Sequence, residues 1–83
     1  MNLNHEEMYA CIGRNIAYYR KLRNLSQLEL AEQINMSRTH LSCIEAPNMN
    51  VRPSLNALLD IAVALDIPAS YLLDTNDPFK KML

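Results

Sequence analysis

The chain has 83 residues, 49% of them hydrophobic, and carries a formal net charge of −1 with one Gly and no Trp. This length fits one domain with a modest core, so we expect no second, ligand-binding domain within these residues. The apolar content argues against a disordered chain and favours a compact all-α bundle.

Charge is distributed unevenly along the chain. Between residues 8 and 52 there are six Lys and Arg against three Asp and Glu, whereas four acids oppose two Lys residues after position 52. One end of the molecule can therefore face phosphates although the whole is nearly neutral. We expect no strong nonspecific binding to DNA as a polycation.

The cysteines and termini indicate a cytoplasmic protein. Cys11 and Cys43 fall in predicted helices and do not form a disulfide framework, so reduced thiols are expected. No signal peptide and no membrane span is predicted, because the N-terminus is polar and no apolar run is long enough. His40 and Cys43 supply only two metal ligands, and His5 and Cys11 are not spaced to complete a zinc site. We expect no metal and no cofactor.

A first helix is predicted over about residues 7–23, after a flexible N-terminus at residues 1–7. Its inward side chains are Ile12, Ile16 and Tyr19. A second helix follows Ser26, which caps it and forms a capping box with Glu29. The apolar residues at helical spacing there are Leu28, Leu30, Ala31 and Ile34.

A tight turn and a third helix follow directly. Asn35 suits the left-handed residue at the helix end, Met36 can plug the turn, and Ser37 caps the third helix. Leu41 and Ile44 form its inward face, and its outward face carries Arg38, Thr39, His40, Ser42 and Cys43. This spacing predicts a helix-turn-helix, whose second helix enters the DNA major groove. The alternative is two ordinary helices of an all-α domain.

The remaining residues predict a loop and two more helices. Residues 46–53 form the loop, with two prolines and two asparagines. Ser54 caps a fourth helix that ends near Leu65, with a core face of Leu55, Leu58, Ile61, Ala62 and Leu65. Pro68 fits the first turn of a short fifth helix at residues 69–73, where Tyr71 and Leu72 should cover the bundle.

These residues resemble the lambda-repressor/Cro type of helix-turn-helix domain, also called the XRE family. The pattern IxxxRxxxxLSQxxLA is matched by Ile16, Arg20, Leu25, Ser26, Gln27, Leu30 and Ala31. The pattern S…LSxIE is matched by Ser37, Leu41, Ser42, Ile44 and Glu45, and PSLxxLLxIAxALxIPxxxLL by residues 53–73.

The resemblance covers about residues 11–73 and implies a compact five-helix, lambda-repressor-like fold. Residues 8–73 then form the Cro/C1-type domain, and residues 74–83 form a C-terminal tail. The sequence departs from the family at Ala46 and Pro47, which follow Glu45 where a glycine is usual. The loop to Pro53 is also longer than usual.

The resemblance implies double-stranded DNA as the partner. Carried over by position, Gln27 bonds a phosphate and braces the recognition helix, while Arg38 and Thr39 read base edges. Arg38 can bond guanine through O6 and N7, and Thr39 can contact a thymine methyl. The other candidate DNA-binding residues are Ser37, His40, Ser42, Cys43, Asn48, Asn50 and Arg52. The alternative for Arg38 is a solvated surface side chain.

The family often pairs an arginine in the first helix with the glutamate that ends the recognition helix. Here these positions are Arg20 and Glu45. Arg20 lies near the inner face, where a charge needs a partner. We therefore expect a buried or half-buried ion pair; the alternative is two ordinary surface charges.

One recognition helix covers little DNA, so a homodimer on a pseudo-palindromic operator is expected. The candidate interface is Ile67, Tyr71, Leu73, Phe79, Met82 and Leu83, unless these side chains fold back on their own domain. The leading prediction is a sequence-specific transcriptional regulator, of the autoregulatory repressor type. The second is a module that binds another protein, such as an antitoxin or anti-repressor. An enzyme is least expected, because no nucleophile–base pair, metal cluster or phosphate-binding loop is present.

Overall fold

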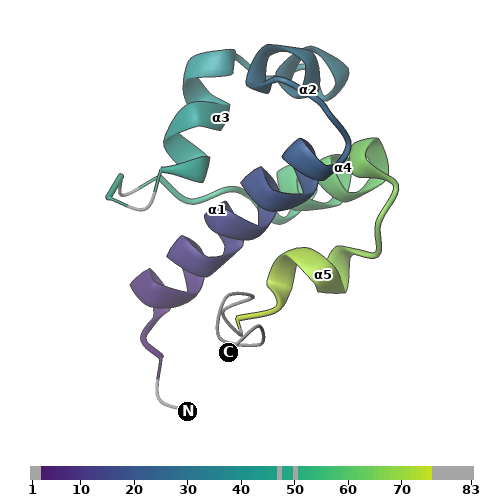
Figure 1. Cartoon of the computed structure of the whole chain (residues 1–83). Helices are drawn as coiled ribbons and strands as arrows, with labels where there is room; N and C mark the ends of the chain where they lie inside the picture. The colour runs from purple at the N-terminus through teal and green to yellow at the C-terminus, as the bar shows by residue number, and fades with distance from the viewer. Residues whose placement is uncertain (1–2, 47, 50, 76–83) are drawn as a thin grey trace.

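The computed structural model describes residues 3–46, 48–49 and 51–75, and these residues form five α-helices joined by turns and loops (Figure 1). The helices are α1 (His5–Leu22), α2 (Gln27–Gln33), α3 (Arg38–Glu45), α4 (Leu55–Leu65) and α5 (Ala69–Leu73). No strand occurs within these ranges. The prediction of an all-α fold with five helices is therefore confirmed.

Helix α1 begins earlier than the sequence predicts. The side chain of Asn4 accepts a hydrogen bond from the backbone N–H of Glu7 at 2.8 Å, and the Glu7 carboxylate accepts one from the Asn4 N–H at 3.4 Å. This capping box starts the helix at His5. Residues 5–7, predicted as part of a flexible N-terminus, are therefore helical, because the two side chains satisfy backbone groups that would otherwise fray.

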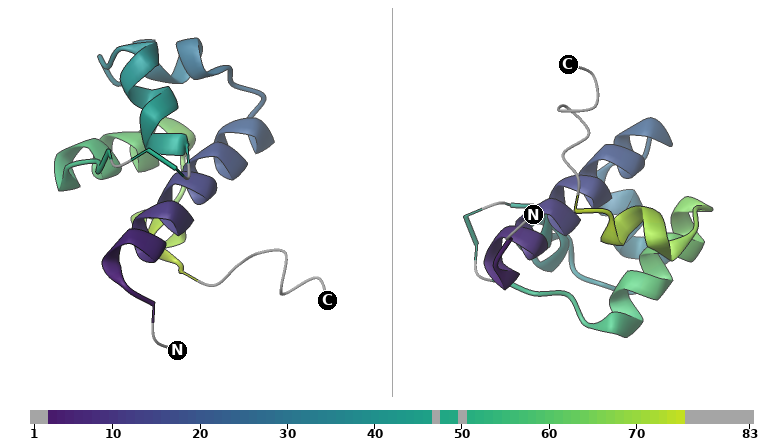
Figure 2. Two further views of the ribbon diagram at one scale, coloured as in Figure 1. Left: turned by 90° about the vertical axis from the view of Figure 1, so that its left-hand side faces the viewer. Right: turned by 90° about the horizontal axis from the view of Figure 1, so that it is seen from below.

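Helix α1 lies between the other helices and contacts both α3 and α5 (Figure 2). Helices α2 and α3 pack against one another on one side of it, and α4 and α5 pack on the other. The shared core consists of Ile12, Ile16, Leu30, Ala31, Leu41, Ile44, Leu58, Ile61, Ala62, Leu65 and Leu72. Every helix contributes to this core, so the position of α3 depends on the whole bundle.

Helix α4 differs from its prediction at one core position. Ser54 caps the helix as predicted, and its hydroxyl accepts from the Ala57 N–H at 3.1 Å. Leu55 was expected on the core face but is 66% exposed. It is the first residue of the helix, ahead of the core face that begins at Leu58, so its side chain points past the bundle. Asp66, at a left-handed φ of 55°, ends the helix.

The fifth helix occupies the predicted residues, but Pro68 precedes it instead of filling its first turn. Pro68 is the N-cap, with φ −60° and ψ 140°, and no side chain caps this helix. Leu72 is fully buried, whereas Tyr71 is 48% exposed and covers the bundle only in part. None of the helices in the described part of the chain has the length and apolar character that a membrane span requires.

Candidate nucleic-acid interface

Helix α2 and the turn after it have the geometry of a helix-turn-helix. The Ser26 hydroxyl accepts from the Glu29 N–H at 3.0 Å, and the Glu29 carboxylate accepts from the Ser26 N–H at 2.9 Å. Asn35 adopts a left-handed φ of 55°, as predicted for the turn. The Met36 N–H then donates to the Ala31 carbonyl at 2.9 Å, and Met36 packs against the core. The turn is therefore closed by backbone and side-chain contacts together.

Helix α3 presents its polar side outward. Ser37 caps it by accepting from the His40 N–H at 3.0 Å. Leu41 and Ile44 are buried, which turns Arg38 and Thr39 out to solvent at the start of the helix. Ser42 and Cys43 are partly exposed one turn later. A helix start with exposed arginine and hydroxyl groups suits contacts to base edges.

An ion pair fixes the end of α3 to α1. Arg20 Nε donates to Glu45 Oε2 at 2.8 Å, and Arg20 Nη2 donates to Glu45 Oε1 at 2.9 Å. The two side chains are only 9% and 6% exposed. The pair is bidentate and buried, as the resemblance implied, and it is not an ordinary pair of surface charges.

Gln27 completes this network from the start of α2. Its Nε2 donates to Glu45 Oε1 at 3.0 Å, so one carboxylate connects α1, α2 and α3. Gln27 is partly exposed. The amide thus braces the recognition helix from beside its outward face.

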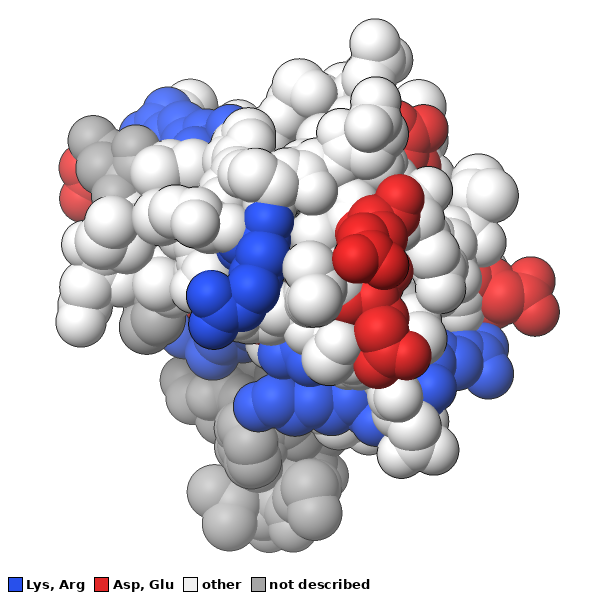
Figure 3. Space-filling model, turned by 90° about the horizontal axis from the view of Figure 1, so that it is seen from above, with Lys and Arg blue, Asp and Glu red and all other residues white. Residues whose placement is uncertain are grey.

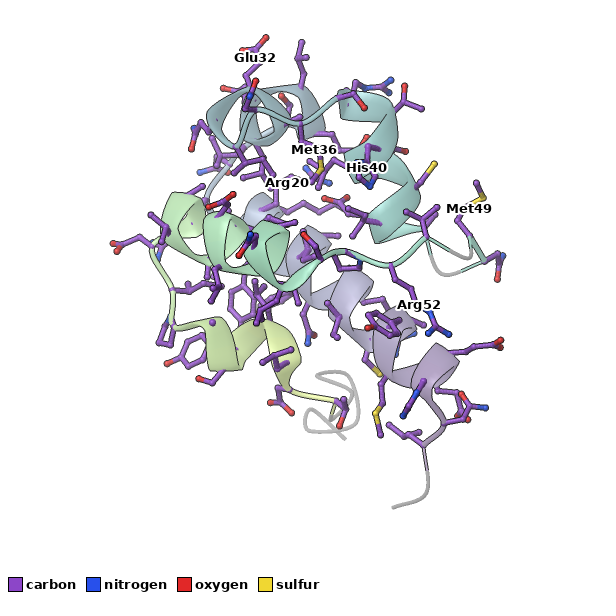
Figure 4. The ribbon with its side chains drawn as sticks, turned by 180° about the vertical axis from the view of Figure 1, so that it is seen from behind. Arg20, Glu32, Met36, His40, Met49 and Arg52 are labelled. Atoms are coloured by element: carbon purple, nitrogen blue, oxygen red, sulfur yellow. The ribbon has the colours of Figure 1, made fainter. Side chains whose placement is uncertain are left out.

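His40 lies on another side of α3. It borders a hollow between the turn and the start of α4, together with Asn35, Ser54 and Asp60. Figure 4 shows His40 on the side of α3 that faces α4. This position is at the margin of the outward face and not at its centre.

The candidate DNA-binding residues of the loop after α3 lie in different surroundings. Asn48 is exposed, and Asn50 lies outside the described residues. Arg52 stacks over the ring of Tyr9, with Cζ 4.7 Å from the ring centroid. Its guanidinium therefore lies against α1 (Figure 4), and it is occupied there by a cation–π contact.

The view from above α2 and α3 shows charges of both signs (Figure 3). The acidic side chains of α2, Glu29 and Glu32, are exposed, and so is Arg38 of α3. In Figure 3 most of the acids lie right of centre, on the α2 side, with one more at the left edge, while Lys and Arg lie at the upper left, near the centre and along the lower edge. The α3 side is thus the more favourable side for a phosphate backbone.

The predicted dimer residues lie partly on an exposed aromatic surface. Ile67 packs against the core, Leu73 is 48% exposed, and Phe79, Met82 and Leu83 lie outside the described residues. The ring of Tyr71 lies 5.7 Å from the ring of Tyr19. The sequence reasoning missed two exposed neighbours on α1, Tyr18 and Leu22, which are 49% and 60% exposed. Tyr18 and Leu22 are four residues apart, so the sequence already indicated that they lie on the same face of α1.

Comparison with known proteins identifies the family. Residues 16–72 match the family model described as Helix-turn-helix. The chain belongs to this family, and its fold is the compact five-helix, lambda-repressor-like one. It is 42% identical over 62 residues to the immunity repressor protein of Bacillus phage phi105, covering 75% of this chain and 42% of that protein. It is 38% identical over 63 residues to the transcriptional regulator SinR of Bacillus subtilis (strain 168), covering 76% of this chain and 56% of SinR.

Two solved structures of SinR are also similar. SinR in complex with DNA has a TM-score of 0.69 at 38% identity, covering 76% of this chain and 98% of that one. The SinR–SinI complex has a TM-score of 0.69 at 35% identity, covering 86% of this chain and 72% of that one. The chain spans about half the length of the curated relatives it matches. These relatives are named as a repressor and a transcriptional regulator, in agreement with the prediction of a non-enzymatic protein.

Proposed function

We propose that this chain is a sequence-specific, double-stranded-DNA-binding transcriptional regulator of the repressor type, acting in the cytoplasm on its own promoter. The observation that carries the proposal is the outward polar edge of α3, which Arg20, Glu45 and Gln27 hold in place through three hydrogen bonds. A relative with 38% identity has been solved in complex with DNA. Fixed contact groups lose less conformational entropy on binding than mobile ones do.

In this proposal α3 lies in the major groove with its N-terminal end toward the bases. Arg38 donates to guanine O6 and N7, and Thr39 contacts a thymine methyl or an acceptor. Ser42 and Cys43 lie in the same groove one turn later. Ser37 and Gln27 contact phosphates in this proposal, and these contacts fix the register without specifying sequence.

We also propose that the protein acts as a homodimer through the exposed face formed by α1 and α5. Tyr18, Leu22, Tyr71 and Leu73 are each about half exposed or more on these two helices. Aromatic side chains of this kind are enriched at protein interfaces. Two copies joined there would read half-sites about one helical turn apart, which requires a pseudo-palindromic operator.

Fluorescence anisotropy tests the DNA proposal, with a duplex from upstream of the gene and a random duplex as the reference. We expect specific binding about 10³-fold tighter than the reference. Arg38→Ala should remove about 1–3 kcal/mol of this preference. The matched control is Arg14→Ala, because Arg14 is also exposed but contacts Cys11 on α1. Equal losses in the two variants would contradict the role of Arg38.

A second candidate function is a module that binds another protein. The similarity to SinR in its complex with SinI supports it. The same Arg38→Ala variant separates the two candidates, because a protein partner bound away from α3 would keep its affinity. If no duplex selected from a random library exceeds the reference, the DNA proposal fails and this candidate takes its place.

A further inference from the structure

The loop between α3 and α4 is anchored to the body of the protein on its C-terminal side. Val51 packs against the core and Pro53 is buried. Between them, Arg52 stacks over Tyr9 of α1. The loop therefore returns from the end of α3 to a fixed point at residues 51–53, and the described residues just before that point, Asn48 and Met49, are exposed.

Residues 46–50, which precede this anchored part of the loop, carry no charge in the sequence. Asn48 is exposed, and Met49 is 51% exposed at the rim of a hollow that Glu6 and Ile44 also line. The Met49 N–H donates to the Ala46 carbonyl at 3.4 Å, which folds the backbone back after α3. Figure 4 shows Met49 beyond the end of α3, while Arg52 lies toward α1.

An uncharged tip of this kind contacts DNA differently from a basic loop. The electrostatic attraction of a loop to phosphates comes from Lys and Arg, and the only cationic side chain of this loop lies over the ring of Tyr9. Apolar side chains such as Met instead contact sugars and base steps in the minor groove, where Asn reads A·T against G·C pairs. The pairing of an exposed Met with an exposed Asn matches the second mode.

We propose that Met49 makes an apolar contact in the minor groove beside the α3 site, with Asn48 next to it at the base edges. This inference rests on the proposed function, since it assumes that α3 occupies the adjacent major groove. It gives the protein a sequence preference outside the base pairs that α3 reaches. It also assigns Arg52 to holding the loop in place instead of to neutralising a phosphate.

The test measures affinity and its salt dependence on a duplex that the wild-type protein selects from a randomised library. Met49→Ala should weaken binding about 3- to 10-fold, from the loss of a partly buried Met contact, without changing the slope of log Kd against log salt. Met49→Leu should keep wild-type affinity. Met49→Lys should raise the magnitude of the slope by about 0.9, because it adds a phosphate contact. Val63→Ala, on the C-terminal half of α4 and 81% exposed, is the control for loss of an exposed apolar side chain.

A repeat selection with Met49→Ala should lose the base preference that flanks the α3 site and keep the preference within it. Unchanged affinity for Met49→Ala, or a loss equal to that of Val63→Ala, overturns the inference. A smaller salt slope for Met49→Ala overturns it as well. A wild-type protein that selects no duplex overturns the proposed function itself, whereas a selected duplex that both proteins bind equally overturns only the role of Met49.

Discussion

Gly13 of α1 lies against the backbone of α3 at Ile44. A β-carbon on Gly13 would overlap the Ile44 carbonyl oxygen and would lie 3.4 Å from the Cα of Glu45. The two helices can come this close only because the residue has no side chain. The single glycine of the chain therefore sets the distance between α1 and the recognition helix.

Gly13→Ala should destabilise the protein although alanine is the better helix former. The higher helix propensity of alanine should stabilise the variant by about 1 kcal/mol, but overpacking against a backbone carbonyl should destabilise it by about 1–3 kcal/mol. We expect a net loss of up to about 2 kcal/mol in the free energy of unfolding, measured by urea denaturation, and weaker DNA binding as α3 shifts. Ala17→Gly, at a partly exposed position elsewhere in α1, measures mainly the difference in helix propensity between Ala and Gly. A Gly13→Ala protein that is more stable and binds DNA normally would contradict the close contact.

This role of Gly13 could not be read from the sequence. A glycine inside a helical pattern indicates either a defect or a close approach, and which of these applies depends on the helix that packs there. The helix-turn-helix, in contrast, was predictable in detail from Ser26, Asn35 and Ser37, because caps and turn residues act through local hydrogen bonds. All three adopt the predicted conformations.

Glu45→Gln tests the network that holds α3. Removing one partner of a buried ion pair leaves the other charge uncompensated, so the free energy of unfolding should fall by about 3–5 kcal/mol. Thermal unfolding measures the change. Replacing both partners, as in Arg20→Met with Glu45→Leu, should cost less than Glu45→Gln alone, because no buried charge remains. A melting temperature equal to that of the wild type for Glu45→Gln would show that the pair contributes nothing.

Glu29 should make stability depend on pH on the acid side. Its hydrogen bonds with the backbone and side chain of Ser26 hold the pKa of its carboxyl below the ordinary value of 4.5. Since the folded-state pKa is the lower one, the stabilisation is complete above pH 4.5 and is lost as the pH falls through the folded-state pKa. Glu29→Gln should flatten this part of the stability curve. Glu32→Gln, also exposed on α2, is the control. The difference in stability between the two variants should be complete above about pH 4.5 and should shrink as the pH falls below it.

The contacts that the sequence did not predict join distant parts of the chain. Arg52 was named as a candidate DNA-binding residue, and its guanidinium lies over the ring of Tyr9, 43 positions earlier. Asn15 attracted no prediction, yet its buried Nδ2 donates to the carbonyls of Leu72 at 3.0 Å and Asp74 at 2.6 Å. Helical periodicity in the sequence predicts on which face of α1 an amide lies, but it does not predict which backbone carbonyls will accept its hydrogen bonds. The start of the tail after α5 is thus fixed by a residue of α1.

Tyr71→Asp tests the proposed dimer face. Tyr71 lies beside Tyr19, whose ring also lies 4.9 Å from that of Tyr18, so a charge at position 71 would be placed within an aromatic surface. Burying that charge between two copies without a partner is costly, so we expect the dimer to dissociate into monomers. Sedimentation velocity measures the mass, and thermal unfolding checks that the monomer remains folded. Val63→Asp places the same charge on α4, outside this face, and should leave the mass unchanged. A Tyr71→Asp protein with the mass of the wild type would remove the α1–α5 face as the interface, and weak operator binding by a folded monomer would connect this face to DNA recognition.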